Sequence, residues 1–220
     1  FAKLQKELPG EVFTTRTLAT YSYELNNKKA PFDNVNVRKA LNLSLDRNVI
    51  TDKVLGQGQT PTYVFTPIYI EEGHLIQQPA YSKEPMAQRN EEAIKLLEEA
   101  GYSKANPLKF TILYNTNENH KKVAIAAASM WKANTKGLID VKLENQEWKT
   151  YIDSRRAGRY DAARAGWNAD YNQATTFGNY FLSNSSNNTA KYANPEYDKA
   201  IAESYVATDA EGRAKAYAKA

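Results

Sequence analysis

The sequence predicts an α/β fold in which a mixed, mostly parallel sheet is flanked by helices. Segments with helical periodicity alternate with short strand-like runs along most of the chain. That order is typical of layered α/β domains, in which a helix returns the chain to a neighbouring parallel strand. No internal repeat is evident, and 220 residues are enough for one large domain or at most two small ones.

In the first half of the chain, residues 21–26 alternate like a strand, and an Asn-rich, Pro-containing stretch ends it. Residues 36–45 carry apolar side chains at helical spacing, and residues 47–55 form a second helical stretch before a Gly-Gln-Gly turn. The next thirty residues are rich in proline and show little periodicity. So long an irregular stretch is typical of a binding face or of a segment that wraps a neighbour.

The second half is more regular. Residues 88–100 form the clearest helix, with an apolar stripe that includes Ala93 and Leu97, and Gly101 ends it. The remaining predicted strands are residues 108–114, 141–146 and 160–166, and the remaining helices are residues 120–135, 148–156 and the stretch from 198 onward.

Composition narrows the functional classes. The chain has no cysteine, which excludes disulfides, catalysis by a thiolate and metal sites with cysteine ligands. The net charge of +4 is mild and its basic residues are dispersed, so we expect no nucleic-acid partner. No run approaches the roughly 18 apolar residues of a membrane span. The chain begins and ends inside predicted helices, so we expect it to be a fragment of a longer protein.

Signatures of catalysis and of cofactors are missing. The pair Gly56 and Gly58 lacks the remaining residues of a phosphate-binding loop. The two histidines, His74 and His120, are far apart and outside any HExxH pattern, so we expect no metal. No G-x-S-x-G elbow is present. We therefore expect neither an enzyme nor a cofactor.

Four segments resemble one family of proteins. Residues 163–172 (ARAGWNADYN) are similar to the ligand-contacting loop of oligopeptide-binding proteins, in the solute-binding family that also handles dipeptides and nickel. Residues 34–47 contain that family's V-R-x-A-L … D-R pattern, and residues 92–101 its A-x-x-L-L-x-x-A-G helix. Residues 145–149 (NQEWK) match the oligopeptide branch. The similarity extends over essentially the whole chain.

The resemblance implies a type II-like periplasmic binding protein with two lobes that close on the ligand. Residues 1–220 would be most of the large, carboxy-terminal ligand-binding lobe, without the amino-terminal lobe and the final return strands. The implied function is to bind oligopeptides in the periplasm and deliver them to the membrane permease of an ABC importer, as a monomer. The alternatives are a receptor for murein peptides or another solute, and, more remotely, a carbohydrate-active hydrolase that would use Asp170 and a second acid.

The resemblance places the ligand's amino terminus at Asp170. A receptor for many sequences must read the groups that all peptides share, and an ammonium removed from water needs a fixed carboxylate. Trp167 would form a flat apolar wall, Gly166 would let the ligand backbone approach, and Arg164 would orient carboxylates. From spacing alone, Asp170 would instead be a helix N-cap or a turn aspartate. The alternatives for Trp167, Gly166 and Arg164 are a core tryptophan, a turn glycine and a surface cation.

The ligand's carboxylate end is implied to lie near His120 and Arg155, with Asn115 close by. The alternatives are a capping histidine in the first turn of a helix and a solvated arginine at a helix end. Asn168, in the same loop as Asp170, is a further candidate for ligand contact, and it departs from the residue typical of such receptors. Leu55 departs too, in a region where a lysine is usual, so no peptide length is predicted. Tyr21 and Tyr23 are weaker candidates.

Overall fold

The computed structural model describes the backbone of residues 1–220 and the side chains of residue 1 and residues 3–220. The helices are α1 (Ala2–Glu7), α2 (Val35–Leu43), α3 (Met86–Glu99), α4 (Glu118–Asn134), α5 (Trp148–Arg156), α6 (Thr175–Gly178), α7 (Pro195–Val206) and α8 (Ala210–Lys219). The strands are β1 (Ala19–Leu25), β2 (Leu108–Asn115), β3 (Ile139–Gln146) and β4 (Ala162–Asn168). Shorter helical segments are η1 (Val49–Leu55), η2 (Gly73–Leu75), η3 (Ala80–Lys83) and η4 (Asn179–Phe181).

The four strands form one sheet in the order β1-β4-β2-β3. Strand β2 pairs in parallel with both β3 and β4, whereas β1 runs antiparallel to β4 along its whole length. The sheet is therefore mixed and mostly parallel, and the predicted fold class is confirmed. The carboxyl ends of β2 and β4 point to the same edge of the sheet, the edge at which ligands gather in open α/β folds.

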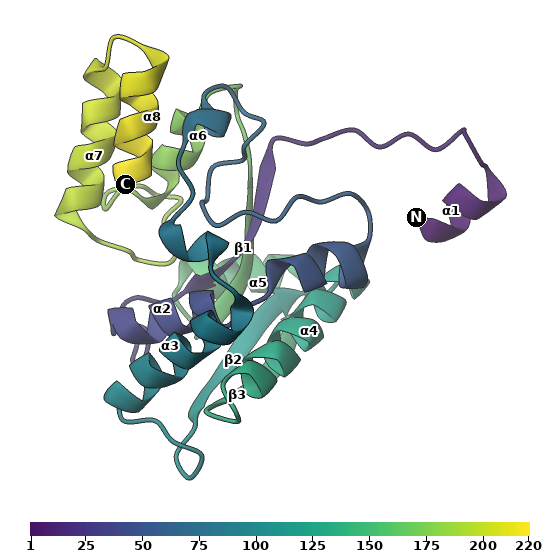
Figure 1. Cartoon of the computed structure of the whole chain (residues 1–220), viewed down its shortest axis with the longest axis vertical. Coiled ribbons are helices and arrows are strands. Elements are labelled where there is room, and N and C mark those ends of the chain that lie inside the picture. The colour runs from purple at the N-terminus through teal and green to yellow at the C-terminus, as the bar shows by residue number, and fades with distance from the viewer.

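Helices α2, α3 and α4 cover one face of the sheet and enclose the main apolar core (Figure 1). Alternate residues of β2, from Leu108 to Tyr114, point into this core because side chains of a strand alternate between its faces. Trp131 of α4 is buried there, and its indole nitrogen donates to the carbonyl of Leu41 over 2.9 Å. Phe32 and Phe110 pack edge to face in the same core.

Helix α5 lies on the opposite face, where Tyr151 packs with Leu113 and Ala163. A second apolar core joins α6, α7 and α8 to the irregular segment 64–76. Figure 1 shows α7 and α8 as an antiparallel pair at one end of the molecule, and α1 separated from the rest by an extended stretch. The long proline-rich segment thus packs against α6–α8.

Side-chain caps explain where several helices begin. Asn34, Asn117, Asn194 and Asp209 each accept a hydrogen bond from a backbone N–H in the first turn of α2, α4, α7 and α8. Asp209 also shows why the predicted helical stretch from 198 onward is two helices, since its cap starts α8 after a break.

Two further helix predictions can be compared with the structure. The predicted end of α3 at Gly101 is confirmed, and this residue has a φ of +92°, which favours glycine. The helical stretch predicted at 47–55 forms, but as the π-helix η1.

Candidate functional site

Several of the predicted site residues lie at the carboxyl ends of β2 and β4. Asn115 is the last residue of β2, and Asn168 is the last residue of β4, two residues before Asp170. His120 is in the first turn of α4, which follows β2. The parallel pairing of β2 and β4 brings these strand ends to one edge of the sheet.

The carboxylate of Asp170 is exposed and oriented by one neighbouring hydroxyl. Thr176 Oγ1 donates to Asp170 Oδ2 over 3.3 Å and accepts from the backbone N–H of Asp170 over 3.2 Å. The indole nitrogen of Trp167 donates to the same hydroxyl over 3.1 Å. Among the described helices, none uses Asp170 as its N-cap, since α6, the next helix, begins after Ala174. The carboxylate therefore remains available to a ligand.

Trp167 is half-buried at the end of β4, next to this carboxylate. Its ring meets the ring of Tyr180 edge to face, with centroids 5.0 Å apart. Gly166 pairs with Tyr21 of β1, and a Cβ placed on this glycine would approach the carbonyl oxygen of Thr20 to 3.2 Å. The missing side chain thus lets the two strands and their surroundings approach closely.

A cation and three ring side chains gather on the other side of β4. The guanidinium carbon of Arg164 lies 5.0 Å from the ring centroid of Tyr21. Tyr21 in turn contacts His120, with centroids 5.5 Å apart, and Tyr23, at 6.2 Å. No carboxylate of the described side chains lies within 4.0 Å of the Arg164 guanidinium. The structure therefore brings together Arg164 and His120 with the weaker candidates Tyr21 and Tyr23.

Polar atoms near these strand ends are buried without a hydrogen-bond partner among the described side chains and backbone. They are Tyr23 OH, Asn115 Oδ1, His120 Nδ1, Gln146 Oε1 and Arg164 Nε. Buried polar groups are satisfied in nearly all folded proteins, and an exception indicates a partner such as water or a ligand. These atoms favour a polar partner, either water or a ligand, beside Arg164 and His120.

His120 is neutral at physiological pH. Burial and the nearby charge of Arg164 lower the pKa of His120 to about 4. In the unfolded chain its pKa is about 6.5. As the pH falls below about 6.5, the unfolded state therefore takes up a proton that the folded state does not, and stability falls until the pH reaches about 4.

We expect His120→Gln to remove this part of the pH dependence. The difference in unfolding free energy between variant and parent is expected to shift in favour of the variant between pH 7 and pH 4.5. Urea unfolding at several pH values measures it, and taking the difference cancels the carboxylates that titrate in the same range. A difference that stays constant over this range would show that the histidine is not desolvated.

Arg155 lies on the opposite face of the sheet from His120 and is engaged inside the protein. Its guanidinium Nη2 is 2.9 Å from Glu24 Oε2, and the Glu24 side chain alternates with that of Tyr23 along β1. Arg155 also donates to the hydroxyls of Tyr180 and Thr189. The structure thus does not bring Arg155 together with His120. Arg155 lies in the last turn of α5 but is buried, so it is not a solvated arginine at a helix end.

Three residues of this region were not found by sequence reasoning: Glu24, Thr176 and Tyr180. The hydroxyls of Tyr180 and Thr189 donate to the buried carboxylate of Glu24, which is 2% exposed. An acidic residue in an alternating strand normally indicates the solvent face. No periodicity in the sequence marks a buried threonine or tyrosine in helices as short as α6 and η4, so only the fold reveals them.

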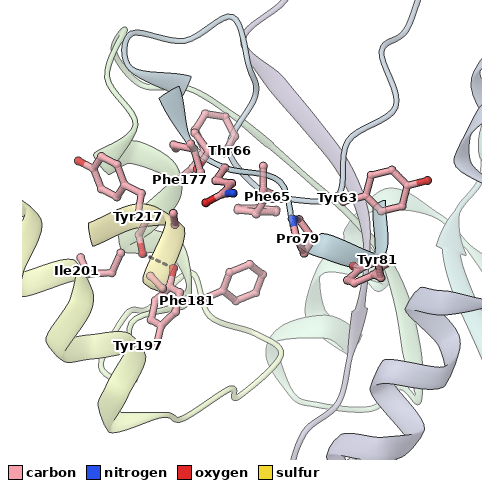
Figure 2. A pocket seen from close by; sticks show the side chains of 16 residues that line it. Tyr63, Phe65, Thr66, Pro79, Tyr81, Phe177, Phe181, Tyr197, Ile201 and Tyr217 are labelled. Carbon is pink, nitrogen blue, oxygen red and sulfur yellow. Dashed lines mark hydrogen bonds between the residues drawn. The ribbon is translucent and has the colours of Figure 1, made fainter. Parts of the chain in front are cut away.

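A cavity of about 400 Å³ lies away from these residues, between the segment 63–81 and helices α6–α8. Aromatic side chains line it, and the hydroxyl of Tyr197 crosses it to the carbonyl of Gly178 over 2.7 Å (Figure 2).

Two kinds of site are missing from the described residues. No cluster of three or more histidine, cysteine, aspartate or glutamate side chains is arranged to hold a metal ion. None of the helices combines the length and the apolarity needed to cross a bilayer.

The chain belongs to the bacterial extracellular solute-binding proteins, family 5, because the model of that family's middle region matches residues 1–189. Over all 220 residues it is 96% identical to the periplasmic oligopeptide-binding protein OppA of Haemophilus influenzae, and 52% identical to the protein of that name from Salmonella typhimurium. The predicted family and the periplasmic location are thereby confirmed.

Among solved structures, the Haemophilus influenzae OppA complex with the peptide RPPGFSPFR matches this fold with a TM-score of 0.96 at 94% sequence identity. It covers 100% of this chain, and this chain covers 43% of it. The chain likewise spans 41% and 40% of the two curated relatives, about two fifths of their length.

Proposed function

We propose that this chain is most of the carboxy-terminal lobe of a two-lobed periplasmic receptor that binds oligopeptides and delivers them to the permease of an ABC importer. The observation that carries the proposal is the exposed carboxylate of Asp170, held beside Trp167 at the carboxyl ends of the strands. The protein binds and releases its ligand without chemical change, so it is not an enzyme. It acts as a monomer and has no nucleic-acid partner.

Asp170 meets the peptide's α-ammonium group. Its Oδ2 accepts from Thr176, and among the described hydrogen bonds its Oδ1 takes part in none, which leaves an acceptor for the ligand. Closure of a second lobe would exclude water and strengthen this ion pair. Trp167 provides a rigid wall for side chains of many kinds, and Gly166 leaves room for the peptide backbone. Asn168 lies at the rim of this subsite.

The peptide's carboxylate lies toward Arg164 and His120. Arg164 has no carboxylate partner among the described residues, and a bidentate guanidinium is well suited to one. Asn115 offers an amide at the neighbouring strand end. Arg155 supports the site from the opposite face, through Glu24 and Tyr180, because its guanidinium is already paired there.

The test is calorimetry on the two-lobed protein with a tripeptide and its N-acetylated twin. Acetylation removes the charge that Asp170 would pair with. We expect it to weaken binding by about thirtyfold or more, because truncating one partner of a buried charge pair costs about 2 to 5 kcal/mol.

Two results would contradict the proposal in different ways. Equal binding of both peptides would show that no carboxylate reads the amino terminus, and Asp170 would lose its role. Binding of neither would show that the ligand is not an ordinary peptide, and a receptor for murein peptides or another solute would take its place.

A further inference from the structure

Thr176 connects the two side chains assigned to the amino-terminal end of the ligand. This residue of α6 is buried, at 4% exposure. Its hydroxyl accepts from the Trp167 indole and from the Asp170 backbone N–H, and donates to the Asp170 carboxylate. A hydroxyl has one proton and two acceptor positions, so its hydrogen-bonding capacity is fully used. No water or further ligand atom is needed to satisfy it.

We propose that Thr176 is a positioning residue of the ammonium subsite, which fixes the direction of the Asp170 carboxylate and ties it to the Trp167 wall. This inference rests on the proposed function, since it assigns how that subsite is held in place. Thr176 does not itself contact the peptide. It acts through Asp170 and Trp167.

The need for such a residue follows from where Asp170 lies. It is an exposed residue in the irregular stretch between β4 and α6, where a side chain is free to populate several rotamers. Holding it in one rotamer on ligand binding costs conformational entropy. Because the Thr176 hydroxyl already directs Oδ2, part of this cost is met before the peptide arrives, and preorganisation of this kind raises affinity.

Thr176 is itself held rigidly. Its neighbours in α6, Thr175 and Phe177, are buried, and Phe177 belongs to the second apolar core. The Trp167 ring is also fixed from its other side by Tyr180, whose hydroxyl donates to the buried Glu24. The hydroxyl of Thr176 is therefore a fixed point from which the exposed carboxylate is directed.

A different role for Thr176 would be to satisfy the Trp167 indole N–H and nothing more. The two roles predict different results for peptides with and without a free amine. If Thr176 serves only Trp167, its loss affects both peptides alike. If it directs the Asp170 carboxylate, its loss affects the free amine far more than the acetylated one.

The experiment compares Thr176→Val, which keeps the shape and removes the hydroxyl, with Thr176→Ser, which keeps the hydroxyl. Calorimetry on the two-lobed protein measures the affinity of each for a tripeptide and for its N-acetylated twin. We expect Thr176→Val to lower the affinity for the free tripeptide by about ten- to a hundredfold, the range for a hydrogen bond to a charged group. Thr176→Ser is expected to stay within about threefold of the parent.

Thr175→Val is the matched control. Thr175 is the adjacent residue of α6 and is similarly buried, at 7% exposure. Its hydroxyl contacts Tyr171 and Gln173 instead of Asp170 or Trp167. We expect this variant to bind both peptides as the parent does. Thermal unfolding of each variant reports any loss of stability, and if Thr176→Val does not fold, Thr176→Ala replaces it.

The outcomes separate this proposal from the function on which it rests. If the parent protein does not distinguish the two peptides, the proposed function fails. If the parent binds the free peptide more tightly than the acetylated one, and the ratio of the two affinities is the same in Thr176→Val, the proposed function stands and the positioning role is wrong. If this ratio of affinities is lower in Thr176→Val and equal to that of the parent in Thr176→Ser, both the proposed function and the positioning role are supported.

Discussion

Replacing Arg155 with methionine is expected to lower the free energy of unfolding by about 3 to 5 kcal/mol, because it leaves a buried charge without its partner. The carboxylate of Glu24 is 2% exposed, and Arg155 Nη2 lies 2.9 Å from it. Burial alone would lower the pKa of Arg155, but the charge of Glu24, the hydrogen bond to it and the nearby Tyr151 and Tyr180 together outweigh burial and raise that pKa above its ordinary value. The arginine is therefore charged at every pH at which the protein is folded.

Urea unfolding of this chain, followed by circular dichroism, measures the effect. Lys132→Ala is the control, since the Lys132 amine is 4.0 Å from Asp140 and their side chains are 67% and 50% exposed. An ion pair so exposed contributes at most about 1 kcal/mol. An Arg155→Met cost no greater than that of Lys132→Ala would contradict the prediction.

A double variant sharpens the argument. Replacing Glu24 with leucine together with Arg155→Met removes both charges and leaves no carboxylate unpaired. We expect it to recover part of the stability lost in Arg155→Met, because exchanging a whole buried ion pair for apolar side chains is often nearly neutral. The hydroxyls of Tyr180 and Thr189 would lose their acceptor, so the recovery should be incomplete.

The elements that the sequence predicts well are those whose pattern and burial agree. Helix α3 has its apolar stripe on the buried side, with Ala93 and Leu97 in the core, and Gly101 after it at a positive φ. Strands β2 and β4 are largely apolar because both their faces are covered. In such elements local propensity and tertiary packing favour the same structure, so periodicity is sufficient.

The sequence-based predictions are wrong or absent where tertiary contacts determine whether a side chain is buried. Glu24 alternates with Tyr23 and would face solvent in a one-sided sheet, but α5 and the segment around Thr189 cover that face. Arg155 lies in the last turn of a helix and carries a charge, and both features normally indicate exposure to solvent, yet its guanidinium is buried in an ion pair with Glu24. Thr176 belongs to α6, a helix of a single turn that is too short to show periodicity in the sequence, so its place beside Asp170 depends on the return of the chain after β4.

Asp170→Asn is expected to weaken binding of a free tripeptide by about thirtyfold to several thousandfold, which corresponds to about 2 to 5 kcal/mol. Asparagine has nearly the same shape, and its side-chain oxygen still accepts from the Thr176 hydroxyl. The substitution therefore removes the charge and leaves the surrounding packing intact. Calorimetry on the two-lobed protein is the measurement, with Asp140→Asn as the control, since Asp140 is the second residue of β3, at the other end of that strand from the site.

The N-acetylated tripeptide completes a double-mutant cycle with this variant. If Asp170 pairs with the α-ammonium group, the substitution and the acetylation remove the same interaction, and their combined cost is much smaller than the sum of the separate costs. If the binding free energies lost through Asp170→Asn and through acetylation simply add, the two changes act independently, and the ammonium group binds elsewhere. The same cycle with Thr176→Val would then show whether the hydroxyl acts through this carboxylate, because its effect on the free peptide should disappear once Asp170 is neutral.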